Sequence, residues 1–309
     1  MRVLSLVTND TANFYRQQVA GLRNRGNTVD TLPVPGNIGT DGERTGSRPV
    51  SSYLWYYPRA VVAAAGAYDV VHANYGLTGP PAVLQPFHPV VLTLWGSDVT
   101  GDISLLSRAC ARFADAVVVM SREMADIVGG DCHVIPHGVE FQTFRPLPQS
   151  TARTEVGWDS EAHQVLFPYG PAREEKNFSR AERIVEEART RLDDPVELQT
   201  MSGVPHERVP WYMNAANAML LTSTREGSPN TVKEALACNL PVVTTDVGDT
   251  AQRVEGVTHS TASNDDEVLV DALVAVLRSG ERSNGREAVA DLQLANQLDR
   301  IEAVYRQVV

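Results

Sequence analysis

Short runs of consecutive apolar residues, separated by stretches with helical periodicity, dominate the pattern of this chain. In its first half these runs occupy 2–7, 69–72, 90–95, 116–120 and 132–135. The residues are apolar in succession rather than alternately, so both faces of each strand are predicted to be covered, as in a parallel sheet. Strands that alternate with helices, such as those expected at 104–114 and 121–128, predict an α/β fold with an open, doubly wound sheet.

A second series of the same kind follows a stretch rich in proline and polar residues, 143–163, which is predicted to be a linker. Strands are expected at 164–168, 196–201, 218–222 and 241–245, and helices at 177–192, 206–216, 229–238, 265–279 and 286–307. We therefore expect two Rossmann-like domains, 1–145 and 146–309, that face a cleft between the carboxyl ends of their strands. A C-terminal helix near 290–309 is a candidate to pack back on the first domain.

Charge and hydropathy exclude several classes of protein. The 309 residues carry a formal net charge of −11, which argues against a nucleic-acid partner because phosphate backbones select basic surfaces. The chain has no apolar run of about eighteen residues that could span a membrane. Its N-terminus, MRVLSLVTND, is more typical of a first strand than of a signal peptide, so a cytoplasmic protein is expected. The glycine-rich stretch 35–46 is predicted to be a surface loop, since no helix start follows at the spacing of a phosphate-binding loop.

The segment 225–249, REGSPNTVKEALACNLPVVTTDVGD, places two glutamates around a predicted helix start. Ser228 is the predicted N-cap and Pro229 the first helical residue, so the next amides would lack intrahelical partners and could bind an anion. Glu226 and Glu234 flank this anion site, which suits a ligand that carries hydroxyls near phosphates, such as a sugar nucleotide. A capped helix with a solvated glutamate is the equally weighted alternative.

A second segment, FPYGPAREEKNF (167–178), follows a strand in the same half of the chain. Arg173 and Lys176 stand three residues apart near a helix start, and both are suited to bind phosphate oxygens. Two surface cations are the alternative. It is weakened because the pair follows the carboxyl end of a strand, where α/β folds bind ligands.

Together these motifs resemble the nucleotide-binding domain of the retaining glycosyltransferases of family 4, which have the GT-B fold. The resemblance rests on EGSPNTVKE with ALACNLPVVTTDVGD, on GPAREEKN, on VPHERVPWYMNAANAMLLTS and on VIPHGVEFQTFRP, and so covers most of 132–255. It implies transfer of a sugar from a nucleoside diphosphate, of the UDP or GDP type, to a glycan or lipid-linked acceptor with retention at the anomeric carbon. It implies no cofactor and no metal, in keeping with the lack of an Asp-x-Asp motif.

The resemblance also implies roles for individual residues. Arg173 and Lys176 would neutralise the leaving diphosphate, Glu234 would hold the ribose hydroxyls, and Glu226 would face the donor sugar near the reacting carbon. The remaining donor-binding positions are Gly170, Gly227, Ser228, Pro229, Asn230, Thr231 and Val232.

The first half resembles the family more weakly, through DVVHANYGLTG (69–79) and VVLTLWGSDV (90–99). His72 is expected to end a strand and face the cleft as a catalytic candidate, although a lone histidine at a strand end is more often structural. Trp95 stands where the family often has histidine, and could stack on an acceptor ring. Further acceptor or cleft contacts are expected from Asn9, Asp10, Asp98 and His137.

The stretch 48–66, RPVSSYLWYYPRAVVAAAG, sets four aromatic residues between two arginines. This composition suits peripheral contact with a membrane, and a partly buried helix is the alternative. For the whole chain the alternatives are a catalytically weak sugar-nucleotide-binding partner of another transferase, a two-lobed small-ligand binding protein, and a GT-B epimerase or phosphorylase.

Overall fold

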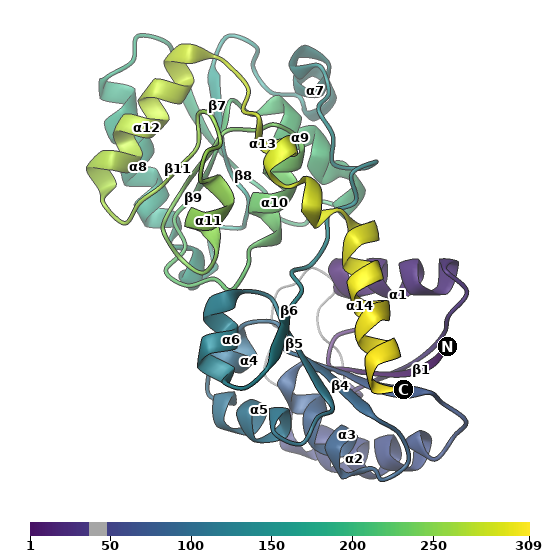
Figure 1. Cartoon of the computed structure of the whole chain (residues 1–309). Coiled ribbons are helices and arrows are strands. Elements are labelled where there is room, and N and C mark those ends of the chain that lie inside the picture. Colours follow the sequence, from purple (N-terminus) through teal and green to yellow (C-terminus); the bar gives the residue numbers. More distant parts are fainter. Residues whose placement is uncertain (37–47) are drawn as a thin grey trace. The chain divides into compact units, whose positions relative to one another are not determined.

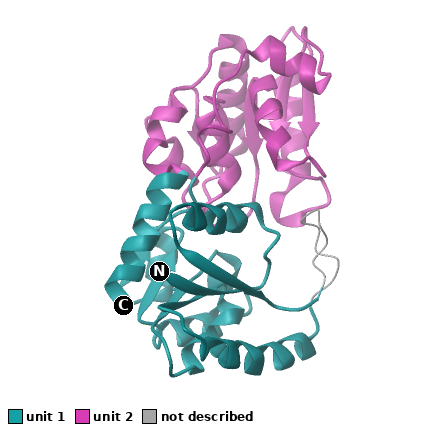
Figure 2. Ribbon diagram, turned by 90° about the vertical axis from the view of Figure 1, so that its right-hand side faces the viewer, with its two compact units in different colours: residues 1–138, 294–309 teal, residues 139–293 magenta. Residues whose placement is uncertain are grey.

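A computed structural model describes residues 1–36 and 48–309 and shows two α/β units (Figures 1 and 2). The first comprises Met1–Gly138 and Leu294–Val309, and the second comprises Val139–Gln293. The predicted α/β class with two parallel, doubly wound sheets is confirmed. The predicted glycine-rich surface loop is 35–46, and its residues 37–46 lie outside the described residues.

The first unit is built on a six-stranded parallel sheet with the order β2-β1-β3-β4-β5-β6. Valine-rich strands fill its centre, where in-register neighbours such as Val3 with Val70 and Val71 with Val90 are fully or almost fully buried. Helices cover both faces, with α1 and α14 on one and α2, α3 and α5 on the other (Figure 1). The elements are β1 (Arg2–Val7), α1 (Asn13–Asn24), β2 (Thr28–Pro33), α2 (Val50–Ala64), β3 (Val70–Asn74), η1 (Gly76–Thr78), α3 (Gly79–Leu84), β4 (Val90–Thr93), α4 (Ser97–Thr100), α5 (Ser104–Ala111), β5 (Ala116–Val119), α6 (Arg122–Val128), β6 (Cys132–Val134) and α14 (Leu294–Val308).

The C-terminal helix α14 belongs to the core of the first unit although it is far from that unit in sequence. Leu298, Ile301, Val304 and Tyr305 lie along one side of the helix and are all buried in this core. Their spacing of three, three and one residues produces the apolar stripe of an amphipathic helix. The chain therefore completes its first unit only with its last residues.

The second unit is built on a five-stranded parallel sheet with the order β11-β10-β9-β7-β8. Two buried clusters, one on each side of the sheet, form its core. Its elements are α7 (Gln149–Val156), β7 (His163–Phe167), η2 (Glu174–Lys176), α8 (Phe178–Thr190), β8 (Val196–Thr200), η3 (His206–Arg208), α9 (Val209–Ala215), β9 (Ala218–Leu221), α10 (Asn230–Ala237), β10 (Val242–Thr244), α11 (Thr250–Val254), β11 (Thr261–Ala262), α12 (Asp266–Ser279), α13 (Gly285–Ala288) and η4 (Ala290–Leu292).

Four elements differ from the sequence-based expectation. The predicted linker contains a helix, α7, that begins after Pro148 and ends at Gly157 in the left-handed conformation. The single helix expected at 286–307 is broken, because Gln293 is extended between η4 and α14. Strands β2 and β11 were not predicted. Both lie at sheet edges and carry polar residues, so neither shows the apolar run of a central strand.

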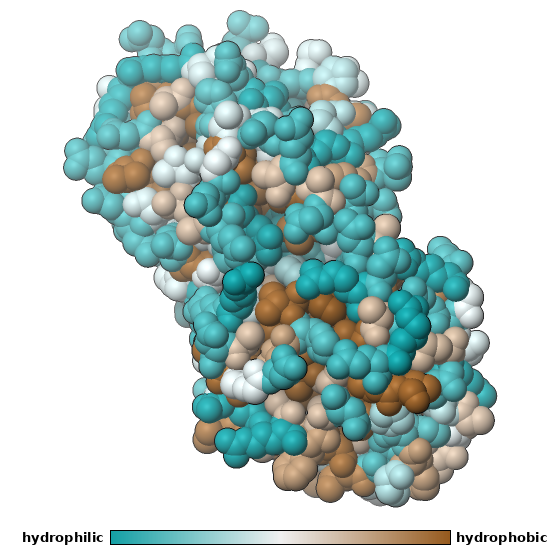
Figure 3. All heavy atoms as spheres, viewed as in Figure 1, coloured by the Kyte–Doolittle hydropathy of each residue, from teal (hydrophilic) through white to brown (hydrophobic). Residues whose placement is uncertain are grey.

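The surface is uneven in hydropathy. Figure 3 shows apolar atoms, brown and tan, along the rim of the first unit over the helices that Figure 1 labels α2, α3 and α5. Within residues 1–36 and 48–309, no helix is long and apolar enough to cross a membrane.

Candidate functional site

In the second unit, two loops meet at the point where the order of strands reverses. The chain passes from β7 to β8 on one side of the sheet, then crosses to β9 on the other side of β7. The loops after β7 and β9, residues 168–177 and 222–229, therefore leave adjacent carboxyl ends, which is where open α/β sheets bind ligands. Backbone and hydroxyl contacts join them: Thr224 N–H donates to the Glu175 carbonyl at 2.9 Å, and Thr222 Oγ1 donates to the carbonyl of Asn177 at 2.9 Å.

An ion pair links the two loops at their centre. Lys176 Nζ lies 2.6 Å from Glu226 Oε1, with only 6% and 11% of the two side chains exposed. Ser223 Oγ donates to the same carboxylate oxygen at 2.7 Å. Two residues fifty positions apart in sequence are thus held together with little solvent around them. Lys176 has three N–H donors, so the bond to Glu226 leaves it able to bind a further anion.

Both predicted cations lie close to the ring of Tyr169. The Arg173 guanidinium lies 5.0 Å and the Lys176 ammonium 4.2 Å from the ring centroid. The Tyr169 hydroxyl lies 3.1 Å from Thr231 Oγ1, in the first turn of α10. Arg173 also pairs with Glu175 at 2.7 Å, but the two side chains are 46% and 42% exposed, so the pair is weak. The two cations predicted to act together do lie together, around one aromatic ring beside the start of α10.

The start of α10 differs in detail from the prediction. The N-cap is Pro229 and the helix begins at Asn230, so the prediction that Ser228 caps the helix is wrong. The reason is a competing acceptor, since Ser228 Oγ donates to Asp249 Oδ2 at 2.8 Å. No side chain caps the first turn, which leaves its N–H groups at the positive end of the helix. Asn230 Oδ1 is buried and has no hydrogen-bond partner within the described residues.

A third loop, after β10, contacts and stabilises the loop that carries Glu226. Asp249 N–H donates to the Gly227 carbonyl at 3.2 Å, and the Asp249 carboxylate accepts from Ser228 and, at 2.8 Å, from Arg253 Nε. Gly248 has φ +60°, and a Cβ there would lie 2.4 Å from the Gly227 carbonyl oxygen. Only glycine fits this position, because the backbone is left-handed and the neighbouring loop is in contact.

Glu234 and Lys233 lie one turn into α10. Burial raises the pKa of Glu234 to about 7, and the nearby Lys233 opposes this rise. Burial lowers the pKa of Lys233 to about 8. The Glu234 carboxylate makes no hydrogen bond or ion pair within the part of the chain that the structure describes. It can therefore still accept or donate a hydrogen bond to a ligand.

His72 does not lie where the sequence suggested. It stands in the middle of β3 rather than at its end and is 1% exposed. Its Nδ1 lies 2.6 Å from the Tyr305 hydroxyl and its Nε2 lies 2.7 Å from Thr93 Oγ1. Burial lowers its pKa to about 3. The histidine joins α14 to the sheet, and both of its nitrogens are occupied, so it is not available to a substrate.

Asp98 is also inaccessible, contrary to the expectation of an acceptor or cleft contact. Its carboxylate accepts hydrogen bonds from the backbone N–H groups of Gly76, Trp95 and Gly96 at 2.8–2.9 Å. Burial raises its pKa, and these backbone bonds oppose the rise. Asp98 thus fastens together the loops after β3 and β4, where Tyr75 and Gly96 both have positive φ.

The other predicted residues of the first unit lie at the carboxyl edge of its sheet. Trp95 is half-buried in an aromatic cluster, with ring centroids 4.8 Å from Phe14 and 6.3 Å from His137. Asn9 folds back on its own loop, accepting from Thr11 N–H at 3.0 Å, whereas the neighbouring Asp10 is exposed. The loop after β1 and the loops after β3 and β4 flank the point at which the order of this sheet reverses.

Sequence reasoning missed residues that complete the site in the second unit. Tyr169 lies two residues after β7, Ser223 follows β9 and Asp249 follows β10, so each stands after a strand in a segment already singled out. Their position after parallel strands was the sequence signal that could have identified them. Only contacts in three dimensions show what each of them holds.

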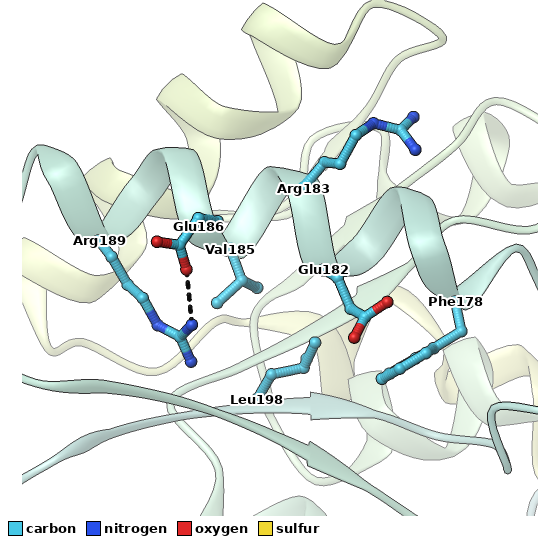
Figure 4. A pocket seen from close by; sticks show the side chains of 7 residues that line it. All are labelled: Phe178, Glu182, Arg183, Val185, Glu186, Arg189 and Leu198. Carbon is cyan, nitrogen blue, oxygen red and sulfur yellow. Dashed lines mark hydrogen bonds and ion pairs between the residues drawn. The ribbon is translucent and has the colours of Figure 1, made fainter.

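A groove of about 460 Å³ lies elsewhere on the second unit, between α8 and the edge strand β8. Figure 4 shows Phe178, Glu182 and Leu198 along it, with the Glu186–Arg189 ion pair at one end. No predicted site residue lines it.

Comparison with known proteins shows the family of the chain. The family model described as "Glycosyl transferase 4-like domain" matches residues 3–138, and the model "Glycosyl transferases group 1" matches residues 161–279. The chain belongs to the group 1, family 4-like glycosyltransferases.

Individual members of this family are only distantly similar. TuaC of Bacillus subtilis strain 168, a glycosyltransferase assigned to teichuronic acid biosynthesis, is 28% identical over 58% of this chain, and the match spans about half (54%) of TuaC. Two solved structures share the GT-B fold over 99% of the chain. Sucrose-phosphate synthase of Thermosynechococcus elongatus has a TM-score of 0.79 at 19% identity and 99% coverage of its own chain. Anabaena HepE in complex with UDP has a TM-score of 0.73 at 16% identity and 100% coverage.

Proposed function

We propose that the protein is a retaining glycosyltransferase that transfers a sugar from a nucleoside diphosphate, of the UDP or GDP type, to a glycan or lipid-linked acceptor. The observation that carries this is the buried Lys176–Glu226 pair beside Arg173 and the uncapped start of α10, at the switch point of the second unit. Membership of the family supports the reaction class, and the UDP complex of HepE supports the donor class. The name of TuaC supports a glycan acceptor.

In this proposal the diphosphate lies against Arg173, Lys176 and the first amides of α10. Negative charge grows on the diphosphate as its bond to the anomeric carbon breaks, so these groups bind the transition state more strongly than the ground state. No metal is needed in this scheme, because two cations and a helix N-terminus supply the positive charge.

Glu226 would accept hydrogen bonds from the donor sugar through the carboxylate oxygen that Lys176 and Ser223 leave available. Glu234 would bind the ribose hydroxyls of the nucleotide. With a pKa near 7, Glu234 can serve in either protonation state, because both states can bond to a hydroxyl. The first unit would hold the acceptor, with Trp95 as a stacking surface for a sugar ring.

The donor site is tested by thermal unfolding of the parent and of Arg173→Ala with UDP, GDP, ADP and TDP. A nucleotide at 100 times its Kd should stabilise the parent by about 2.7 kcal/mol. The stabilisation should be much smaller in Arg173→Ala, whose arginine is exposed and not needed for folding. Arg183→Ala, which removes an exposed arginine of α8, is the matched control and should respond like the parent. Equal nucleotide stabilisation of both variants would show that the diphosphate lies elsewhere.

The reaction itself is tested with Glu226→Gln, which keeps the size of the side chain but removes its charge. Turnover of a nucleotide sugar should fall more than nucleotide affinity, since the proposed contacts of Glu226 are with the sugar. Nuclear magnetic resonance of the product should show the anomeric configuration of the donor. Nucleotide binding with no transfer to any acceptor would favour the alternative, a sugar-nucleotide-binding partner of another transferase.

A further inference from the structure

Tyr169 is held in place along the whole length of its side chain. Its ring packs against both buried clusters of the second unit and meets the ring of Phe167 edge-on, with the centroids 6.3 Å apart. Its hydroxyl lies 3.1 Å from Thr231 Oγ1, in the first turn of α10. Because apolar contacts hold the ring and a hydrogen bond holds its tip, the ring has a defined position at the end of the sheet.

Arg173 receives only weak support from its ion pair. Its partner Glu175 stands two residues away, and both side chains are exposed. Exposed pairs of this kind contribute little to fixing a side chain, because water and salt screen them. The ring of Tyr169 has its centroid 5.0 Å from the guanidinium carbon, and is a firmer partner because it is itself fixed.

Lys176 is buried beside the same ring. Its ammonium lies 4.2 Å from the ring centroid, and the negative face of an aromatic ring attracts a cation more strongly where water is excluded. A contact with a neutral ring differs from a salt bridge in one respect that matters here. It positions a cation without neutralising it, so the positive charge remains available to an anion.

Two cations that are held close together and remain charged suit a ligand with two adjacent phosphate groups. We propose that Tyr169 is a positioning residue for the diphosphate of the donor, and that its ring places Arg173 and Lys176 before the donor binds. This inference rests on the donor site proposed above. The competing explanation is that Tyr169 only joins the two apolar clusters, a role that leucine could also fill.

The placement of Lys176 can be observed directly by nuclear magnetic resonance, because Lys176 and Lys233 are the only lysines of the chain. Protein labelled at the ε carbon of lysine should give two signals, and Lys176→Arg identifies which of them belongs to Lys176. The ring current of Tyr169 should place that signal upfield of the position of free lysine. Tyr169→Phe keeps the ring and should keep this shift, whereas Tyr169→Leu should abolish it.

Calorimetric titration with UDP and with uridine separates positioning from a structural role, and GDP with guanosine provides a second pair. In Tyr169→Leu the affinity for UDP should fall about tenfold, because both cations lose their contact with the ring. The affinity for uridine, which has no phosphate, should stay that of the parent. Tyr169→Phe should restore most of the UDP affinity.

Tyr212→Leu is the matched control. Tyr212 is also a partly buried tyrosine of the second unit, and its ring packs on Trp158 with the centroids 5.6 Å apart. This variant should leave the Lys176 signal and the affinity for UDP unchanged.

Three results would overturn the proposal. A Lys176 signal at the same position in Tyr169→Leu and in the parent would show that the ring does not place this lysine. Equal losses of UDP and uridine affinity in Tyr169→Leu, or no loss of either, would show that the tyrosine is purely structural. A parent with the upfield Lys176 signal that binds neither UDP nor GDP would refute the donor site itself, and with it the use of this arrangement for a diphosphate.

Discussion

At the residue scale, the site depends on side chains that hold loops as much as on those that can touch a ligand. Asp249 fixes the Gly227–Ser228 segment from behind, and Gly248 allows the two loops to touch. Asp98 does the same in the first unit through three backbone N–H groups. Buried carboxylates that accept several backbone bonds are common devices for fixing irregular backbone, because the bonds offset the cost of desolvation.

Gly248→Ala should destabilise the second unit and displace the loop of Glu226. Its matched control is Gly256→Ala, which has φ +71° but no atom near the position of a Cβ. The control should lose only the left-handed strain, about 1–2 kcal/mol. Gly248→Ala should lose clearly more, since its Cβ would lie 2.4 Å from a backbone oxygen. Urea unfolding measures both, and equal losses would contradict the close approach of the two loops.

The buried His72 should make the first unit sensitive to acid. Its pKa is about 3 in the folded chain and 6.5 for an unperturbed histidine. Between these two pH values the unfolded state therefore binds a proton that the folded state does not bind. The resulting stability is complete above pH 6.5 and is lost as the pH falls toward 3. Between pH 7 and pH 5 the parent should lose about 2 kcal/mol more than His72→Gln. Urea unfolding at these two pH values tests this, and parallel losses would show that His72 is accessible to protons.

At the scale of elements, α14 matters most for the first unit. Its residues Ile301, Val304 and Tyr305 are each at most 3% exposed, and Tyr305 also bonds to His72. A helix that buries this much of one side is held by packing rather than by its own propensity. Its ion pairs at the surface, such as Arg25 with Asp299 at 2.6 Å, add little by comparison.

Ile301→Ala should therefore lower the free energy of unfolding of the first unit by about 2–5 kcal/mol, as expected for a large-to-small change in a core. The exposed Gln307, on the same helix, provides the control. Gln307→Ala should change stability by less than about 0.5 kcal/mol. Chemical unfolding of both variants is the measurement, and a loss below about 1 kcal/mol for Ile301→Ala would argue that α14 is loosely attached.

At the scale of the whole molecule, the chain forms two cores, one from a single continuous segment and the other from two separate segments. The second unit is a single segment, Val139–Gln293, closed by a bridge between its first and last residues. The first unit needs two segments that lie at opposite ends of the chain. The two units should therefore differ in whether a simple fragment can fold.

The fragment 139–293 should unfold cooperatively by itself and keep the nucleotide stabilisation of the parent. The fragment 1–138 should not, because it lacks the four buried side chains of α14. Joining 294–309 to it through a glycine–serine linker should restore cooperative unfolding, as seen by circular dichroism. Equal melting curves with and without the joined helix would refute this account of the core.

Much of this architecture was predictable from local sequence. Apolar runs identified the central strands, because a strand covered on both faces has a recognisable composition. Edge strands such as β2 were missed for the same reason, since one side of an edge strand can be polar. The break at Gln293 was missed because apolar periodicity continues on both sides of it, and only dihedral angles reveal the interruption.

The candidate site was predictable in its residues but not in its pairings. Lys176, Arg173 and Glu226 could be selected because they follow strands, yet their sequence positions do not show that Lys176 binds Glu226 rather than solvent. His72 and Asp98 were misjudged, since polar residues near strand ends look alike in sequence whether they face solvent or the core. Burial is a property of the packed molecule, and sequence supplies only its average tendency.

The sequence by itself determined the fold class, the family and the segments that carry the chemistry, because these depend on local composition and spacing. The tertiary structure alone decided which side chains contact each other although they are fifty or more residues apart in sequence. It also decided which histidine is buried in a core and which helix face remains exposed. These outcomes depend on how distant segments pack, and the sheet order, which reverses between β7 and β9, brings those segments together.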